Sequence, residues 1–207
     1  MKLILASGSP RRREILTNLG IPFEVVTCET DEGCDLTDPA AYVRELAARK
    51  GEAVRELLRG RGADLREMLI LAADTVVAQD STILGKPANR ADAVRMLTDL
   101  SGREHAVYSG IALLCGEEIA TAAERTAVHV SPLSAQEIER YVATGEPDDK
   151  AGGYAIQGHA SPWIKGIEGD YFNVVGLPVK RLFDLLRDEF GISARELINS
   201  AKTDTKG

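Results

Sequence analysis

The chain has 207 residues, of which 44% are hydrophobic and 28% are charged, and its formal net charge is −7 at pH 7. This composition is typical of a globular protein with a sizeable core, and the length fits one domain. An acidic chain lacks the basic face that coats a nucleic acid polymer, and its apolar stretches are too short to cross a membrane. We therefore expect neither of these partners.

Strand-like apolar runs alternate with amphipathic segments of helical period, which favours an α/β fold with a largely buried sheet. The first strand is expected at 2–6. A helix follows it, with Ser9 as N-cap, Pro10 at the first helical position and Gly20 at the end. A strand at 23–27, a helix from the cap Asp38 to about Leu58 and a loop at 60–64 come next.

The middle of the chain predicts long strands and a hairpin. The run 68–79 is too long for one simple strand, so we expect two strands with a break at Asp74. A helix is expected at 87–102. The segment 105–130 predicts a long hairpin that turns at Gly116 and Glu117.

The last third predicts short elements and a closing helix. Residues 134–137 form a capping box that starts a short helix ending at Gly145. Short strands separated by glycines are expected in 152–158, 161–169 and 171–176. A helix is expected over 177–191, and a polar tail follows it.

The cysteines predict a reducing compartment. Cys28, Cys34 and Cys115 are odd in number, form no Cys-x-x-Cys motif and have no histidine at a zinc-like spacing, so neither a disulfide framework nor a zinc site is indicated. The first residues do not match a signal peptide. We expect a cytoplasmic protein.

Three consecutive arginines at the start of the first helix are unusual in an acidic chain. On a helical wheel Arg12 faces the apolar stripe, Arg11 flanks it and Arg13 points away. Free backbone N–H groups, the positive end of the helix dipole and an arginine fork together attract phosphate. Ser7 and Ser9 would add hydroxyl donors. The alternative is a capped helix whose arginines extend to water.

The second helix also places a charge on its apolar stripe, at Lys50. A buried lysine is unfavourable unless it is paired or faces a cleft. Lys50 is therefore either a residue at the edge of the stripe that reaches water, or a lysine facing a cleft, where it meets an anion or a base.

Two carboxylates are candidate site residues. Asp74 follows an apolar run, and ligands of open α/β sheets bind beyond the carboxyl ends of strands. Glu32 would supply a second carboxylate for a hard cation such as Mg²⁺. The alternatives are a turn or bulge residue for Asp74 and a solvated acidic loop for Glu32.

Two further loops hold polar groups. Lys86 precedes a helix that starts with proline, and the glycine-rich segment 145–158 contains Gln157. Taken singly, each loop fits an ordinary surface. Together with the basic and acidic groups above, an amide that can pair with a base edge indicates a nucleotide ligand. The histidines are scattered and receive no catalytic role.

Five ordered motifs resemble those of the Maf family of nucleoside triphosphate pyrophosphatases, also called septum formation inhibitor Maf. The motifs are LASGSPRR, AADTVV with LGKP, LSGREHAVYSG, GEPDDKAGGYAIQG and GDYFNVVGLP. The resemblance implies an elongated mixed sheet with flanking helices and a central cleft, similar to the inosine triphosphate pyrophosphatases. Residues 1–191 would form one domain with two lobes, residues 192–207 a polar tail, and the protein a homodimer.

The resemblance also implies an activity and a set of site residues. The activity is hydrolysis of a nucleoside triphosphate to the monophosphate and pyrophosphate with Mg²⁺ or Mn²⁺, which would clear non-canonical or modified pyrimidine nucleotides. Asp74 corresponds to the proton acceptor. The residues that resemble phosphate- and metal-handling positions are Ser7, Ser9, Arg11, Arg12, Glu32, Lys50 and Lys86, with Glu32 and Asp74 as the metal ligands.

The family divides by base preference. A branch that acts on 7-methyl-GTP has Trp, Gln and Glu where this chain has Arg11, Thr75 and Gln157, and the pattern found here resembles the dTTP/UTP branch. Gln157 offers a donor and an acceptor, which match the N3–H and a carbonyl of thymine or uracil. The alternatives are 7-methyl-GTP hydrolysis and a non-enzymatic nucleotide-binding regulator of cell division.

Overall fold

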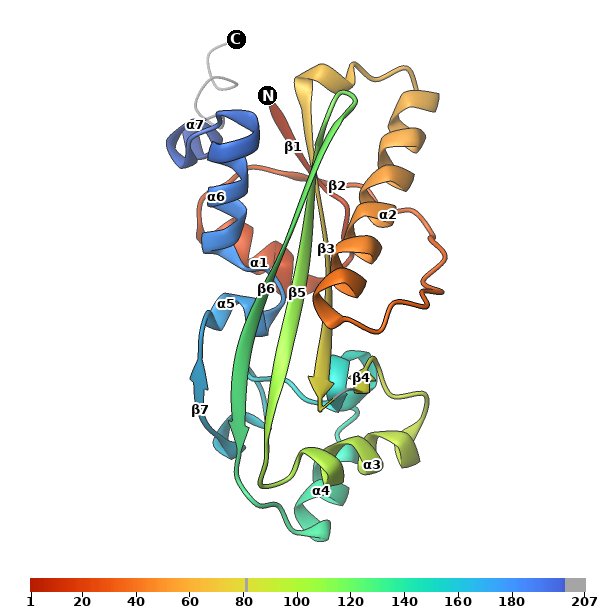
Figure 1. The fold of residues 1–207 in the computed structure, drawn as a ribbon, viewed down its shortest axis with the longest axis vertical. Helices are drawn as coiled ribbons and strands as arrows, with labels where there is room; N and C mark the ends of the chain where they lie inside the picture. The colour runs from red at the N-terminus through yellow and green to blue at the C-terminus, as the bar shows by residue number, and fades with distance from the viewer. Residues whose placement is uncertain (81, 200–207) are drawn as a thin grey trace.

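One long, twisted sheet runs through the molecule (Figure 1). The computed structural model describes residues 1–80 and 82–199. The strands are β1 (Lys2–Leu5), β2 (Glu24–Val25), β3 (Met68–Gln79), β4 (Thr82–Leu84), β5 (Glu104–Cys115), β6 (Glu118–Val130) and β7 (Ile164–Glu168). Their order is β2-β1-β3-β5-β6-β7, with β4 paired to β3. Strand β1 runs parallel to β2 and β3, and the remaining pairs are antiparallel.

Helices cover both faces of the sheet. They are α1 (Pro10–Asn18), α2 (Pro39–Gly60), α3 (Arg90–Leu100), α4 (Ala135–Val142), α5 (Tyr171–Val175), α6 (Val179–Phe190) and α7 (Ala194–Asn199). Short 3-10 helices lie at Leu65–Glu67, Glu146–Asp149, Ala151–Gly153 and Ser161–Trp163. None of the described helices is both long and apolar enough to span a membrane.

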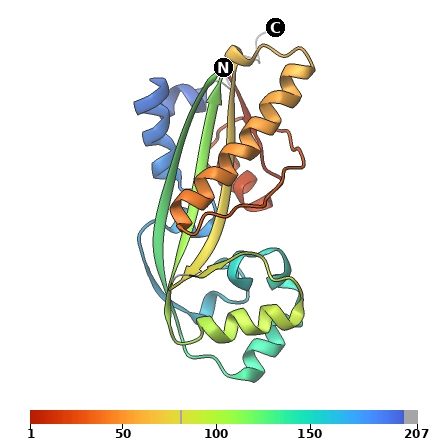
Figure 2. The same ribbon diagram turned by 45° about the vertical axis from the view of Figure 1, so that its right-hand side comes forward.

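The helices divide the molecule into two lobes. In the upper lobe of Figure 1, α2 lies on one face of the sheet and α1 with α6 on the other, and Figure 2 shows the same layers from a second side. Period-two alternation assigns the strand residues to these layers: Leu69 and Leu71 pack in the core with α1 and α6, whereas Ile70 and Ala72 pack in the core with α2. The lower lobe is built around α3 and α4.

The expected break at Asp74 is wrong, because β3 is continuous. Its antiparallel ladder with β5 runs without interruption from Ile70 to Ala78, and Asp74 lies opposite Gly110. A charged residue is tolerated in mid-strand because its side chain has a cationic partner on α2. Asp74 therefore lies in the middle of a long strand and not at a strand end.

Two of the expected short strands are also wrong. In 152–158, Gly152 and Gly153 have φ values of 67° and 73°, a left-handed conformation that a strand does not use. Residues Tyr171–Val175 form α5, which is capped by Asp170 through the backbone N–H of Phe172. The strand expected in 161–169 is confirmed as β7, and the hairpin as β5 and β6.

The chain beyond Gly191 differs in part from the expected polar tail. Helix α7 forms there, and its Leu197 is buried in the core beside α6. Residues 200–207 of the tail lie outside the described residues.

Gly110 sets the distance between α2 and the sheet. A Cβ at this position would lie 2.3 Å from the carbonyl oxygen of Val43 and 2.4 Å from its carbonyl carbon. Only glycine therefore allows α2 to pack this closely on β5, directly across from Asp74.

We predict that Gly110→Ala lowers the free energy of unfolding by about 1–3 kcal/mol, because overpacking forces the helix away from the sheet. Urea denaturation measures this change. Gly60→Ala is the matched control, since Gly60 ends the same helix and a Cβ there would meet nothing within 4 Å. Equal stability of the two variants would contradict the close packing.

Candidate active site

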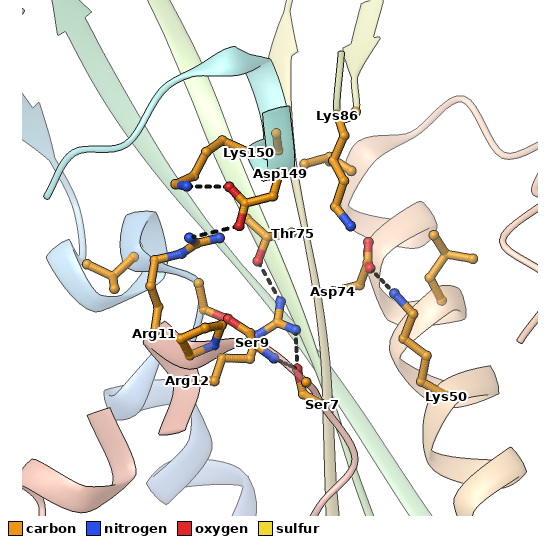
Figure 3. A pocket seen from close by; sticks show the side chains of 18 of the residues that line it. Ser7, Ser9, Arg11, Arg12, Lys50, Asp74, Thr75, Lys86, Asp149 and Lys150 are labelled. Carbon is orange, nitrogen blue, oxygen red and sulfur yellow. Dashed lines mark hydrogen bonds and ion pairs between the residues drawn. The ribbon is translucent and has the colours of Figure 1, made fainter. Parts of the chain in front are cut away.

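A cleft of about 1130 Å³ lies between the two lobes. All ten site residues expected from the sequence line it: Ser7, Ser9, Arg11, Arg12, Glu32, Lys50, Asp74, Thr75, Lys86 and Gln157. Figure 3 labels all of these except Glu32 and Gln157, and shows Asp74, Lys50 and Lys86 on one side and the arginines and serines on the other.

The cleft opens where β3 lacks a neighbouring strand. Strand β1 pairs with β3 only as far as Leu71, and β4 begins its pairing at Val77. The edge of β3 between these points, which carries Asp74 and Thr75, faces the cleft. Asp74 and Thr75, in the middle of the long strand, therefore face the cleft and are not buried in either hydrophobic core.

Lys50 links two carboxylates at the centre of the site. Its Nζ lies 2.6 Å from Asp74 Oδ1 and 2.8 Å from Glu32 Oε1. Burial acts to lower the pKa of Lys50, but Asp74 and Glu32 outweigh this effect and the pKa is raised. The hydrogen bond from Lys50 in turn lowers the pKa of Glu32. The expectation of a cleft-facing lysine is confirmed, and this group is held as a cation.

Arg12 is held from three directions. Its Nε donates to the carbonyl of Gly176 at 2.8 Å, Nη1 donates to Ser7 Oγ at 2.9 Å, and Nη2 donates to Thr75 Oγ1 at 3.1 Å. Thr75 Oγ1 also lies 2.8 Å from Ser109 Oγ. Burial lowers the pKa of Arg12 to about 10, an effect that Asp74 opposes. Arg12 therefore faces inward as expected, as a charge fixed by the protein.

Arg11 reaches across the cleft. Its Nη1 lies 3.7 Å from Asp149 Oδ2, and Asp149 also pairs with Lys150 (Figure 3). This contact joins the N-terminus of α1 to the loop of the lower lobe. Because the pair is long and partly exposed, it contributes little to stability and Arg11 can exchange this partner for another anion.

The remaining expected residues are less constrained. Lys86 is exposed and points towards Asp74 in Figure 3; the preceding Gly85 accepts a hydrogen bond from Gly152 N–H at 2.9 Å, which ties this loop to the glycine-rich segment. Gln157 is exposed, and its amide makes no hydrogen bond within the described chain. Ser9 is the N-cap of α1 without a side-chain capping bond.

Sequence reasoning missed two contributors, Tyr42 and the Gly176 carbonyl, and one contact, between Arg11 and Asp149. Tyr42 lines the cleft, and burial together with Asp74 raises its pKa. The sequence did contain a signal for Tyr42, since this residue lies two helical turns before Lys50 on the same face of the helix. The Gly176 carbonyl and the Arg11 partner Asp149 come from distant segments, and no local pattern indicates either contact.

The donor set suits a cation that is shared with a ligand. The described residues contain no group of three or more His, Cys, Asp and Glu side chains that would hold a metal alone. Glu32 and Asp74 nevertheless converge on one point, where Lys50 Nζ lies. Mg²⁺ commonly takes one or two carboxylates and completes its shell with phosphate and water oxygens. These two residues fit that requirement.

Fold and site together define an α/β protein with a cleft lined by many charged side chains. Five cationic side chains from four separate segments line it, together with four carboxylates: Arg11, Arg12, Lys50, Lys86 and Lys150, and Glu29, Glu32, Asp74 and Asp149. The sequence model of the Maf-like protein family matches residues 2–189. The chain therefore belongs to the Maf family.

Relatives of high identity support this membership. The chain is 51% identical over 191 residues to the dTTP/UTP pyrophosphatase of Symbiobacterium thermophilum, covering 92% of this chain and 94% of the relative. It is 47% identical over 194 residues to the dTTP/UTP pyrophosphatase of Caldanaerobacter subterraneus subsp. tengcongensis, covering 93% and 91%. Among solved structures, the Staphylococcus aureus Ham1 protein is similar at 13% identity and a TM-score of 0.47, covering 100% of this chain and 99% of that one.

We predict that Arg12→Lys lowers the free energy of unfolding by about 1–3 kcal/mol, because an ammonium group cannot satisfy the carbonyl and both hydroxyls in the same geometry. Urea denaturation at neutral pH tests this. Arg13→Lys is the control, because Arg13 is exposed on the same helix. If the two variants lose the same stability, the three bonds of Arg12 do not contribute to folding.

Proposed function

We propose that this protein hydrolyses nucleoside triphosphates, with dTTP and UTP preferred, to the monophosphate and pyrophosphate. The observation that carries the proposal is the meeting of Asp74, Lys50 and the two arginines in one cleft of a Maf-family chain. Relatives at 47% and 51% identity that bear the name dTTP/UTP pyrophosphatase support the substrate.

The basic residues bind the triphosphate. Arg11, Arg12, Lys50 and Lys86 supply positive charge along the cleft, and the N-terminus of α1 adds backbone N–H groups and the dipole. Arg12 is already oriented by its three bonds, so it needs little reorganisation as charge develops on the phosphates. The local field thus opposes the overall negative charge of the chain.

Asp74 is the proposed general base. Its Oδ1 is engaged by Lys50, and Oδ2 has no hydrogen-bond partner within the described chain, so Oδ2 is available to orient a water and accept its proton. The water oxygen attacks the α-phosphorus, and the bond from that phosphorus to the bridging oxygen of the β-phosphate breaks. Pyrophosphate leaves with the electron pair, and Lys86 and Arg11 stabilise its charge.

A divalent cation, Mg²⁺ or Mn²⁺, would be held by Glu32 and Asp74 together with the phosphates. When bound, it would neutralise phosphate charge and favour attack by water. Lys50 shares both carboxylates, so it balances their charge and keeps them together before substrate arrives.

Gln157 is the proposed base reader. It lines the cleft with an unengaged amide, which can accept from the N3–H and donate to a carbonyl of thymine or uracil. Thr75, the residue after Asp74, acts differently from Gln157, since its hydroxyl is bonded to Arg12 and Ser109. Its part is to hold the arginine, and base selection falls to Gln157.

We predict that Asp74→Asn folds but releases pyrophosphate from dTTP about 10²–10⁴-fold more slowly, since the amide cannot accept the proton. A pyrophosphate-release assay with Mg²⁺ or Mn²⁺ measures the rate, and Asp35→Asn on an exposed loop serves as control. Turnover near that of the wild type would remove Asp74 as the base. A wild type that binds dTTP but releases no pyrophosphate would instead support non-catalytic nucleotide binding.

We predict that Gln157→Glu loses activity on dTTP and UTP by about tenfold or more, because a carboxylate cannot donate to the base carbonyl and leaves it unpaired. The measurement is kcat/KM for each nucleotide, with 7-methyl-GTP included as an alternative substrate. Gln136→Glu, on the exposed side of α4, controls for the added charge. Unchanged values for Gln157→Glu would show that another residue reads the base.

A further inference from the structure

One carboxylate contacts the far end of the loop that carries Gln157. Glu146 lies at the start of this loop, just after α4, and its side chain is 17% exposed. Its Oε1 accepts a hydrogen bond from the hydroxyl of Tyr141 at 2.9 Å. Its Oε2 accepts from the backbone N–H of His159 at 3.1 Å and lies 3.0 Å from His159 Nδ1. Glu146 thus joins the end of α4 to the far end of the loop.

Tyr141 extends this contact to a second point of the loop. Its hydroxyl oxygen accepts a hydrogen bond from the backbone N–H of Ala155 at 3.3 Å while donating to Glu146. Tyr141 is buried, and its ring packs edge-on against Trp163 with centroids 4.9 Å apart. Burial, with Glu146 adding to the effect, raises the pKa of Tyr141. The phenol is therefore a neutral donor with a fixed direction.

Gly158 allows the carboxylate to contact the loop backbone. A Cβ at this position would lie 2.5 Å from Glu146 Oε1 and 2.7 Å from its carboxyl carbon. The loop therefore rests directly on Glu146. Both flanks of Gln157 are fixed in this way, Ala155 by Tyr141 and His159 by Glu146.

The Gln157 side chain has no hydrogen bond of its own within the described residues, so its orientation depends on the backbone that carries it. We propose that Glu146 and Tyr141 are positioning residues that hold Gln157 for base recognition and so determine selectivity for pyrimidine nucleotides. This inference rests on the proposed function. It adds two residues, Glu146 and Tyr141, that are not among those lining the cleft.

The test compares four variants of the full chain. Glu146→Ala removes the carboxylate, Tyr141→Phe removes only the shared hydroxyl, and Glu146→Gln keeps one acceptor oxygen. Glu139→Ala is the matched control on the exposed side of α4. The measurements are kcat and KM for dTTP and dGTP and the dissociation constant of inorganic tripolyphosphate. Fluorescence of Trp163, the one tryptophan of the chain, reports on Tyr141.

We expect Glu146→Ala to lower kcat/KM for dTTP about tenfold, mainly through KM, since a base contact of ordinary hydrogen-bond strength is lost. Activity on dGTP and affinity for tripolyphosphate should stay at the wild-type level, so the dTTP-to-dGTP ratio falls. Tyr141→Phe should give the same pattern, Glu146→Gln an intermediate one, and Glu139→Ala none.

Three results would overturn the inference, and they differ in what they say of the proposed function. If the wild type discriminates between dTTP and dGTP but Glu146→Ala and Tyr141→Phe retain the same ratio, Glu146 and Tyr141 do not position Gln157 and the proposed function stands. If the wild type shows no preference for dTTP over dGTP, the proposed function and this inference both fail. A parallel loss of tripolyphosphate affinity would assign Glu146 a general structural role and also overturn the inference.

Discussion

The ion pair between Lys50 and Asp74 connects the two elements on which the cleft depends. Asp74 lies in the middle of β3 and Lys50 on α2, and their 2.6 Å contact is possible because Gly110 lets the helix lie against the sheet. Removing one member of such a partly buried pair would leave the other charge without a partner, which is more unfavourable than losing the attraction alone. The site and the packing of the upper lobe are therefore coupled through this contact.

The second half of the site is organised around Arg12, which draws on four separate segments. The arginine comes from α1, Ser7 from the loop between β1 and α1, Thr75 from β3 and the Gly176 carbonyl from the turn after α5. That turn is itself held by buried Asn173, which donates to the Val107 carbonyl at 3.0 Å. A residue distant in sequence from Arg12 can thus affect the orientation of its guanidinium.

More of the candidate site than of the surrounding fold could be predicted from the sequence. The positions of Lys50 and Arg12 followed from helical periodicity, because a charge on an apolar stripe is visible in the sequence. The break expected at Asp74 was wrong because periodicity within one strand says nothing of the cation supplied by α2. The strand expected at 171–176 was wrong because Asp170 caps a helix there, a local contact that outweighs the β-rich composition.

The sequence by itself determined the residue types that the cleft uses, the helix that stops just before Gly20, the hairpin that turns at Gly116 and the motifs that belong to the Maf family. These are local properties, set by periodicity, capping and turn chemistry. Only the tertiary structure decided that Glu32 shares Lys50 with Asp74, that Arg11 meets Asp149, and that Glu146 clamps the loop of Gln157. Each of these contacts joins segments whose approach depends on how the lobes pack, and that packing sums many interactions distant along the chain.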